Sequence, residues 1–400
     1  MVNSSNLNKA KKAKSDEFYT QYDDIQKEIE AYLEYNPDVF RNKVVYCNCD
    51  DPFESNFFRY FVLNFNKLGL KQLITTSYKP SPVANSQLGL FGDDKTLIKS
   101  KGRPKVTANK FIINEVHDID GDGEFNLKDV AMQLRANKQN EWMPLECDGD
   151  FRSDECINLL KQSDIVVTNP PFSLFRQYVK QLFDYNKKFI IIGNMNAITY
   201  KEIFPLIKDN KMWLGAGKND GRNVWFQIPD HYETFHKEEN GKKYAFVAGT
   251  IWFTNLDHGR RHQPLPLMTT TEVIKFGAKK SFEKYDNYNA IEVSQVKYIP
   301  SDYDGVMGVP ISFLSKYNPD QFEILGATQR GCHDKVPDTK KYNDYWEVRQ
   351  NGQKTGSSGG KTNENANLVE NDGKKNYFIN NKGRIIQSAY QRIFIKHKKK

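Results

Sequence analysis

The 400-residue sequence has no long apolar run, few cysteines and no internal repeat. No stretch approaches the roughly 18 apolar residues of a membrane-spanning helix. Residues 1–14 are polar and basic and lack the apolar centre of a signal peptide. We therefore expect a monomeric protein that has no membrane anchor and works in the cytoplasm.

The five cysteines are an odd number and are spread widely along the chain. This usage does not suit a disulfide framework, which is typical of small secreted proteins. Zinc binding by the first four is an alternative, but the paired two-residue spacing of a zinc ribbon is missing, so we favour reduced thiols buried as small apolar groups. The cysteines are Cys47, Cys49, Cys147, Cys156 and Cys332.

What the sequence does contain suits a globular protein that binds a polyanion. Its length allows two domains, and its 38% hydrophobic and 13% aromatic residues are enough to pack their cores. The formal net charge is +8, with lysines gathered at residues 9–14 and 396–400. A nucleic acid fits this charge, but basic tails can also serve solubility alone, so the motifs have to separate these alternatives.

Apolar runs alternate with amphipathic helical patterns in residues 1–257. The expected strands are residues 43–47, 72–76, 164–168 and 188–193, and the expected helices include residues 55–68 and 174–185. This alternation predicts an α/β fold in which a mainly parallel sheet is flanked by helices and binds ligands at the carboxyl ends of its strands. Residues 211–214 and 244–254 are expected to complete a mixed sheet with an antiparallel edge.

Residues 258–400 have a different pattern, made of short irregular pieces rich in Tyr, Asn, Gly and Pro. We predict a second domain here that contacts nucleic acid. Residues 352–375 are expected to be a mobile polar loop, followed by a strand pair at 377–379 and 393–395. The candidate contacts to bases or phosphates are Arg260, Arg261, Arg330 and Lys335.

The most informative segment is an apolar strand, residues 164–168, that runs directly into Asn169, Pro170, Pro171 and Phe172. The prolines fix the backbone and have no amide proton, so the Asn169 side chain and the Pro170 carbonyl can accept two hydrogen bonds from one amino group. These bonds favour a tetrahedral nitrogen whose lone pair can attack a methyl group in line. Phe172 would stack on a base taken out of the duplex.

A simpler interpretation of the same tetrapeptide exists. Asn-Pro-Pro is also an ordinary way to open a loop after a strand. The position between an apolar strand and an amphipathic helix favours the catalytic interpretation.

Four segments together resemble the EcoRI-type family of adenine-specific DNA methyltransferases, and the likeness runs along most of the chain. Residues 16–21 (DEFYTQ) resemble the family's N-terminal cofactor motif, and residues 44–52 (VVYCNCDDP) its first loop. Residues 147–151 (CDGDF) resemble the segment beside the cofactor's adenine, and residues 169–172 the catalytic motif.

The resemblance implies a Rossmann-like fold that binds S-adenosylmethionine, followed by a target-recognition region at residues 258–400. Tyr19 and Thr20 would close over the methionine carboxylate, and the first loop would hold the methionine amino group. Asp150 would accept from the adenine amine with Phe151 against the ring. An aspartate after a strand can instead form a turn or cap a helix. The cofactor residues implied are Tyr19, Thr20, Asn48, Asp50, Asp51, Asp150 and Phe151.

Two departures concern the cofactor site. The first loop, residues 48–52, is not rich in glycine, and residues 72–77 end without the acid that usually binds the ribose hydroxyls, so we assign no ribose partner. Methylation of a cytosine ring is disfavoured because it needs a thiolate nucleophile, typically after proline, and no cysteine follows a proline.

The insertion at residues 78–142 carries two weaker patterns. Residues 101–105 (KGRPK) resemble an AT-hook, with Arg103 entering a minor groove, and a basic loop on phosphates is the alternative. Residues 118–129 match a calcium loop in part, and a turn of acids capping the helix expected at 127–137 is the alternative. The candidate calcium ligands are Asp118, Asp120, Asp122, Glu124 and Asp129.

We therefore predict a methyltransferase that acts on N6 of an extruded adenine in duplex DNA, in restriction-modification or an epigenetic role. GAATTC is a candidate target by resemblance only. The alternatives are methylation of an RNA adenine or a protein glutamine, whose planar nitrogens suit the same tetrapeptide, and a DNA-binding protein with a decayed site.

Overall fold

A computed structural model describes most of the chain, and its contacts divide the chain into two compact units. Met1–Ala197 with Met212–Gly259 form one, which we call the N-terminal unit, and Ile198–Lys211 with Arg260–Lys400 form the C-terminal unit. Residues 198–211 thus group with the C-terminal unit, whereas the sequence suggested one continuous boundary at 257. The described residues are 20–49, 55–78, 108–119, 121, 126, 129, 130, 132, 139–217, 224–228, 235–277, 282–328, 336, 338–369 and 375–398.

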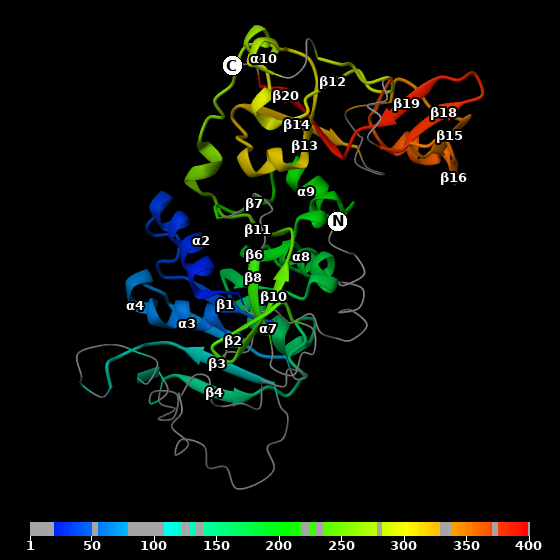
Figure 1. Ribbon diagram of the computed structural model, residues 1–400. Coiled ribbons are helices and arrows are strands. Elements are labelled where there is room, and N and C mark those ends of the chain that lie inside the picture. The colour runs from blue at the N-terminus through cyan, green and yellow to red at the C-terminus, as the bar shows by residue number, and fades with distance from the viewer. Residues whose placement is uncertain are drawn as a thin grey trace. The chain divides into compact units, whose positions relative to one another are not determined.

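The N-terminal unit is built on a mixed sheet (Figure 1). Its strands, in spatial order, are β4 (Glu141–Pro144), β3 (Asn109–Ile113), β2 (Gln72–Thr76), β1 (Val44–Cys47), β5 (Ile165–Thr168), β6 (Lys188–Asn194), β11 (Thr250–Thr254) and β7 (Trp213–Leu214). Strands β2, β1, β5 and β6 are parallel, and β3, β4, β11 and β7 pair antiparallel with their neighbours. The four expected parallel strands and the expected antiparallel edge are confirmed.

Helices cover both faces of this sheet, because successive residues of each buried strand point to opposite sides. On one face, Val45 and Val167 join a core cluster with side chains of α2, α3 and α4. On the other face, Phe183 of α8 contacts Phe189 of β6 with ring centroids 5.7 Å apart. The helices are α2 (Tyr22–Tyr35), α3 (Asn56–Leu63), α4 (Phe65–Leu68), α7 (Asp154–Gln162) and α8 (Phe175–Asp184).

The insertion extends the sheet as a hairpin of β3 and β4. Because β3 is antiparallel to β2 and β4 is antiparallel to β3, β4 runs in the same direction as β2. The chain therefore leaves β4 toward the carboxyl ends of the parallel strands, and Leu145 N donates to Ala108 O at 2.8 Å. This hairpin delivers residues 145–151 to the edge of the sheet where ligands bind.

Residues 244–254 do not form one strand of the main sheet. They divide at Gly249, whose φ of +73° is left-handed, into β10 (Lys242–Val247) and β11. Strand β10 lies between β8 (Val224–Ile228) and β9 (Lys237–Glu239) in a separate three-stranded sheet. The inner face of that sheet buries Phe226 and Ala245.

The C-terminal unit contains two sheets, and neither matches the expected ending. The expected strand pair is wrong, because strands 377–380 and 392–397 exist but belong to different sheets. The expected mobile loop at residues 352–375 is also wrong, because it includes the strands β16 (Lys354–Ser358) and β17 (Asn367–Leu368). One sheet has the order β12 (Ile291–Glu292), β13 (Met307–Pro310), β20 (Arg392–His397), β14 (Phe322–Ala327); the other has the order β16 (Lys354–Ser358), β15 (Tyr345–Val348), β18 (Tyr377–Asn380), β19 (Ile385–Ser388), β17 (Asn367–Leu368).

The helices of the C-terminal unit are short. They include α9 (Phe204–Lys208) and α10 (Thr270–Phe276), which begins with a capping box between Thr269 and Glu272. Across the described residues of the whole chain, no helix has both the length and the apolar character needed to span a membrane.

Candidate active site

The tetrapeptide from Asn169 to Phe172 lies at the carboxyl end of β5, in the middle of the main sheet. Asn169 and Pro170 are buried, and Pro171 and Phe172 are half-buried. The Pro171 carbonyl accepts from Leu174 N at 2.9 Å in the short turn that leads into α8. Strand, prolines and helix together fix the backbone that carries the Asn169 side chain and the Pro170 carbonyl.

Asn48 follows the neighbouring strand β1 and is joined directly to the end of β5. Strands β1 and β5 are parallel, with Val45 opposite Ile165, so their carboxyl ends lie side by side. The Thr168 hydroxyl donates to the Asn48 carbonyl, and Asn48 is buried. The loop predicted to bind the cofactor and the segment predicted to be catalytic therefore meet at one place on the sheet.

Tyr178 of α8 links this place to the third motif. Its hydroxyl donates to Asn48 Oδ1, and its ring meets the edge of Phe151 at a centroid distance of 5.0 Å. Burial raises the pKa of Tyr178, so the hydroxyl stays a neutral donor. Gln181, one turn further along α8, donates from Nε2 to the Phe151 carbonyl at 3.0 Å.

The sequence reasoning missed both Tyr178 and Gln181. They are three residues apart on the helix that follows the catalytic segment, so they lie on one face of it. This three-residue spacing is the feature of the sequence that could have identified Tyr178 and Gln181 as a pair facing the site.

The loop that carries Asp150 packs tightly against the end of β2. Gly149 has a φ of +82°, and a Cβ at this position would lie 1.9 Å from the Ser77 carbonyl oxygen, so only glycine fits. Asp150 receives hydrogen bonds from Arg152 Nε at 2.9 Å and Nη2 at 2.5 Å. The side-chain bonds from Arg152 hold the pKa of Asp150 below its usual value, so this acceptor stays ionised at neutral pH. Arg152 is a further residue that the sequence reasoning missed.

Thr20 lies beside the start of α3. Its carbonyl accepts from Asn56 Nδ2 at 2.7 Å. The Thr20 hydroxyl is buried and has no hydrogen-bond partner in the described part of the chain. The other residues expected near the methionine moiety, Tyr19, Asp50 and Asp51, lie outside the described residues.

The end of β2 supplies hydroxyl groups where an acid is more usual. Tyr46 and Thr76 share a hydrogen bond of 3.0 Å between their hydroxyls, and Ser77 Oγ accepts from Asn109 N at 2.8 Å. These contacts hold the end of the strand.

The candidate nucleic-acid residues have different surroundings. Arg260 is exposed, whereas Arg261 is buried and donates from Nη2 to Asn210 Oδ1 inside the C-terminal unit. That contact suits a packing role for Arg261 better than a role at a DNA surface. Arg103, Arg330 and Lys335 lie outside the described residues.

The described residues give no support to a metal site. No group of three or more His, Cys, Asp or Glu among them could hold an ion, and the four described cysteines are free thiols. The Asp129 carboxylate accepts from Ile119 N at 2.8 Å and from Asn126 N at 2.9 Å. Asp118 accepts from Gly121 N at 2.7 Å. The remaining candidate calcium ligands, Asp120, Asp122 and Glu124, lie outside the described residues.

Comparisons with known proteins agree with the family suggested by the motifs. A family profile described as "Adenine-specific methyltransferase EcoRI" matches residues 6–398. The Type II methyltransferase M.EcoRI of Escherichia coli is 48% identical to this chain over 324 residues, which cover 80% of this chain and 88% of the relative.

Two mycoplasma relatives extend this comparison. M.MgeORF184P of Mycoplasma genitalium and M.MpnI of Mycoplasma pneumoniae, both also described as Type II methyltransferases, are 37% and 36% identical over 325 residues. These matches cover 80% of this chain and 85% and 84% of the relatives. No solved structure gives a significant match. Since the profile spans nearly the whole chain and the motifs meet at one edge of a Rossmann-like sheet, this protein belongs to the EcoRI family of adenine-specific methyltransferases.

Proposed function

We propose that this enzyme transfers a methyl group from S-adenosylmethionine to the exocyclic N6 of an adenine within a specific sequence of duplex DNA. The observation that carries the proposal is the junction of β1 and β5. There, buried Asn169 and Pro170 lie next to Asn48 of the first cofactor loop through the Thr168 contact. An amino group and a methyl donor bound at adjacent strand ends would be in line for transfer.

The protein's part in the reaction is to position and polarise the amino group. Asn169 Oδ1 and the Pro170 carbonyl accept hydrogen bonds from the two N6–H groups, which localises the nitrogen lone pair that is otherwise delocalised into the ring. The target base has to leave the helix first, because N6 is out of reach inside the stack. Phe172 is half-buried beside these acceptors and offers a face for the extruded ring.

Members of this family use S-adenosylmethionine, and the described residues fit it. The Thr20 hydroxyl, which is buried and has no hydrogen-bond partner among the described residues, suits a carboxylate. Ionised Asp150 suits an amine, and Phe151 is held edge-on by Tyr178. When bound, the cofactor would supply a sulfonium methyl carbon; its bond to sulfur would break as the bond to nitrogen forms, and N6 would then release one proton to solvent. Tyr19, Asp50 and Asp51 stay predictions for the methionine end.

The C-terminal unit is proposed to hold the DNA and read the target sequence. The relatives are described as Type II methyltransferases, which suggests that this enzyme also protects DNA in a restriction-modification system. GAATTC stays a candidate target, and calcium at residues 118–129 stays an untested prediction from the sequence.

The test measures which polymer accepts the methyl group. Tritiated S-adenosylmethionine is incubated with duplex DNA, RNA and cell protein, and label in N6-methyladenine of DNA is expected. Asn169→Ala should lower transfer by at least about 100-fold, as loss of one preorganised polar contact does elsewhere, with little change in DNA affinity. Asn158→Ala, at an exposed position in α7, is the matched control. Label in RNA or protein alone would refute the proposal.

A further inference from the structure

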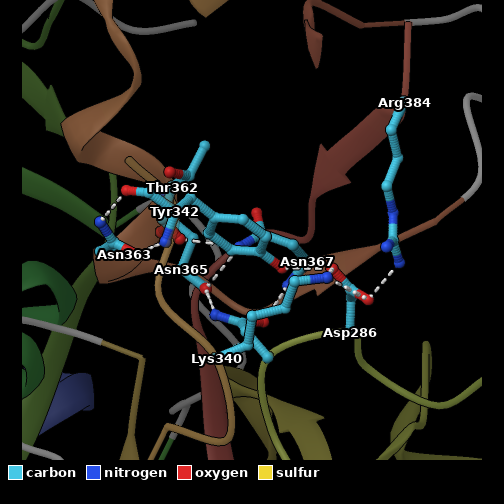
Figure 2. Close-up of polar contacts among 9 residues, drawn as sticks. Asp286, Lys340, Tyr342, Thr362, Asn363, Asn365, Asn367 and Arg384 are labelled. Carbon is cyan, nitrogen blue, oxygen red and sulfur yellow. Dashed lines mark hydrogen bonds and ion pairs between the residues drawn. The ribbon is translucent and has the colours of Figure 1, made fainter. Parts of the chain in front are cut away.

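A group of charged side chains in the C-terminal unit includes none of the residues assigned above. Asp286 is at its centre (Figure 2). Lys340 Nζ lies 2.9 Å from Asp286 Oδ2 and 3.2 Å from Oδ1, and Arg384 Nη2 lies 2.6 Å from Oδ1. The Tyr342 hydroxyl donates to Oδ2 at 2.8 Å. We call Asp286, Lys340, Tyr342 and Arg384 the Asp286 cluster.

The Asp286 carboxylate is nearly buried, whereas the Lys340 and Arg384 side chains are partly exposed to solvent. The Asp286 side chain is 10% exposed, against 35% for Lys340 and 45% for Arg384. Burial raises the pKa of Asp286, but hydrogen bonds from Lys340 and Tyr342 and the two positive charges outweigh it, so the pKa is below its usual value. At neutral pH the cluster therefore presents a net charge of +1 at the surface.

The chain around the cluster is held by one hydrogen bond between backbone groups and by two between a side chain and the backbone. Asp286 N donates to the Asn367 carbonyl at 2.8 Å. Tyr342 N donates to Asn363 Oδ1 at 2.8 Å, and Asn363 Nδ2 donates back to the Tyr342 carbonyl at 2.9 Å (Figure 2). The two cations are thus placed before any ligand arrives, which reduces the entropy lost when they bind one.

The spacing of the cations suits one phosphate group. Both nitrogens are hydrogen-bonded to Asp286 Oδ1, so they lie less than about 6 Å apart. An ammonium carries three N–H donors and a guanidinium five, so each retains donors after bonding Asp286. Two such donors can reach two oxygens of one phosphate in charge-assisted hydrogen bonds.

The surrounding sequence is strongly basic. Residues 338–398, which carry both cations, contain twelve Lys and Arg but six Asp and Glu, a net formal charge of +6 out of +8 for the whole chain. Charge of one sign concentrated in one region attracts a polyanion and repels basic partners.

We propose that Lys340 and Arg384, held by Asp286, bind a phosphate of the DNA backbone. This proposal rests on the proposed function, because DNA is the polyanion that the enzyme would methylate. A backbone phosphate is the same in every sequence, so the contact adds affinity and fixes the position of the DNA without reading bases.

The test compares double variants in DNA binding at several salt concentrations, using a short duplex that the wild-type protein methylates and a scrambled one. Lys340→Ala/Arg384→Ala should weaken both complexes about tenfold and reduce the salt slope of log K by about 1. Lys340→Arg/Arg384→Lys, which keeps the charge, should stay near wild type. Lys180→Ala/Lys201→Ala, which removes two lysines that are 75% and 76% exposed, is the matched control and should change little.

Each outcome decides the proposal. An unchanged affinity in the first variant overturns it, and so does a loss of affinity with an unchanged salt slope, which would mark a structural role only. A loss confined to the methylated sequence also overturns it, since that would mean base recognition. Failure of the proposed function would show separately, as absence of methyl transfer to DNA by the wild-type protein.

Discussion

The two units use buried polar groups in different ways. In the N-terminal unit, the polar contacts around Asn48 and Tyr178 are short links between the ends of neighbouring elements of one regular sheet. In the C-terminal unit, Asn287 is buried and bonds both the Asn365 carbonyl, at 2.8 Å, and Asn367 N, at 2.9 Å, so it ties together irregular segments about 80 residues apart in the chain.

Because of this difference, we expect mutations of polar residues to have different effects in the two units. Backbone hydrogen bonds and the apolar core stabilise the main sheet, so the polar side chains at the carboxyl ends of its strands are not needed for its stability and can take part in chemistry. The C-terminal unit has short strands and depends on side-chain hydrogen bonds and ion pairs to hold them. Damage to polar groups should therefore appear in turnover or cofactor binding in the first case, and in stability or DNA binding in the second.

The largest effect is expected from the buried ion pair of the C-terminal unit. Arg392 and Glu292 are 9% and 4% exposed, with Nη2 and Oε1 2.6 Å apart. Arg392→Met leaves the Glu292 carboxylate buried without its cation and should lower the free energy of unfolding by about 3–5 kcal/mol. Urea titration measures this change, and the protein that remains folded should transfer methyl groups at nearly the wild-type rate.

The control for this pair replaces both charges. Glu292→Gln/Arg392→Met should be more stable than the single variant, because no uncompensated charge stays buried. If Arg392→Met were as stable as wild type, the ion pair would not stabilise the fold. A large fall in turnover would contradict the expectation that polar mutations in the C-terminal unit affect stability and not catalysis.

In the N-terminal unit, Gly149→Ala should have the next largest effect. The new methyl group would collide with the Ser77 carbonyl, and the left-handed φ adds strain, so we expect a loss of at least about 3 kcal/mol or a displaced loop with a higher KM for the cofactor. Gly241→Ala is the matched control: its φ is +73°, but nothing lies within 4 Å of an added Cβ, so strain alone should cost about 1 kcal/mol. Equal effects at the two positions would argue against the tight packing.

A smaller effect is expected from Tyr178→Phe. The change leaves Asn48 Oδ1 without its donor in a buried place, which typically costs about 1–3 kcal/mol. Because Asn48 belongs to the loop that we propose binds the cofactor, the loss should appear as a roughly tenfold higher KM for S-adenosylmethionine, with unchanged affinity for DNA. Tyr185→Phe, at the half-buried end of the same helix, should leave both unchanged. A fall in kcat alone would contradict a positioning role.

The sequence predicted the strands and catalytic segment of the N-terminal unit because their signals are local. Residues 164–172 combine a buried apolar run with a rigid turn, and both features can be recognised without their neighbours. The hairpin of β3 and β4 was only half predictable. Residues 110–116 have the apolar pattern of a strand, and β3 (Asn109–Ile113) lies there, but no pattern indicated its partner β4.

Residues 352–375 show why the C-terminal unit was harder to predict. Composition alone indicated a mobile loop, but Asn367 is buried, and its Nδ2 donates to the Thr362 carbonyl at 2.7 Å while its N–H reaches Asn287. Polar residues can order a segment when their partners are distant in sequence, and such pairings leave no periodic pattern. The same holds for Asp286, whose partners Lys340 and Arg384 come from two later segments.

The smallest effect should be the contribution of Asp286 to stability at low pH. Its pKa is lowered in the folded protein, so its stabilising contribution is complete above the unfolded value near about 4 and disappears as pH falls through the folded value. Asp286→Asn removes this dependence, so acidification from about pH 5 to about pH 3 should destabilise the wild type more than the variant. Urea unfolding at several pH values measures the difference, with Asp184→Asn, an exposed carboxylate in the N-terminal unit, as the control for loss of one charge. Parallel curves for wild type and Asp286→Asn would mean that the two cations bind Asp286 too weakly to be held for a phosphate, and the contrast between a unit organised for chemistry and a unit organised to hold DNA would lose its clearest support.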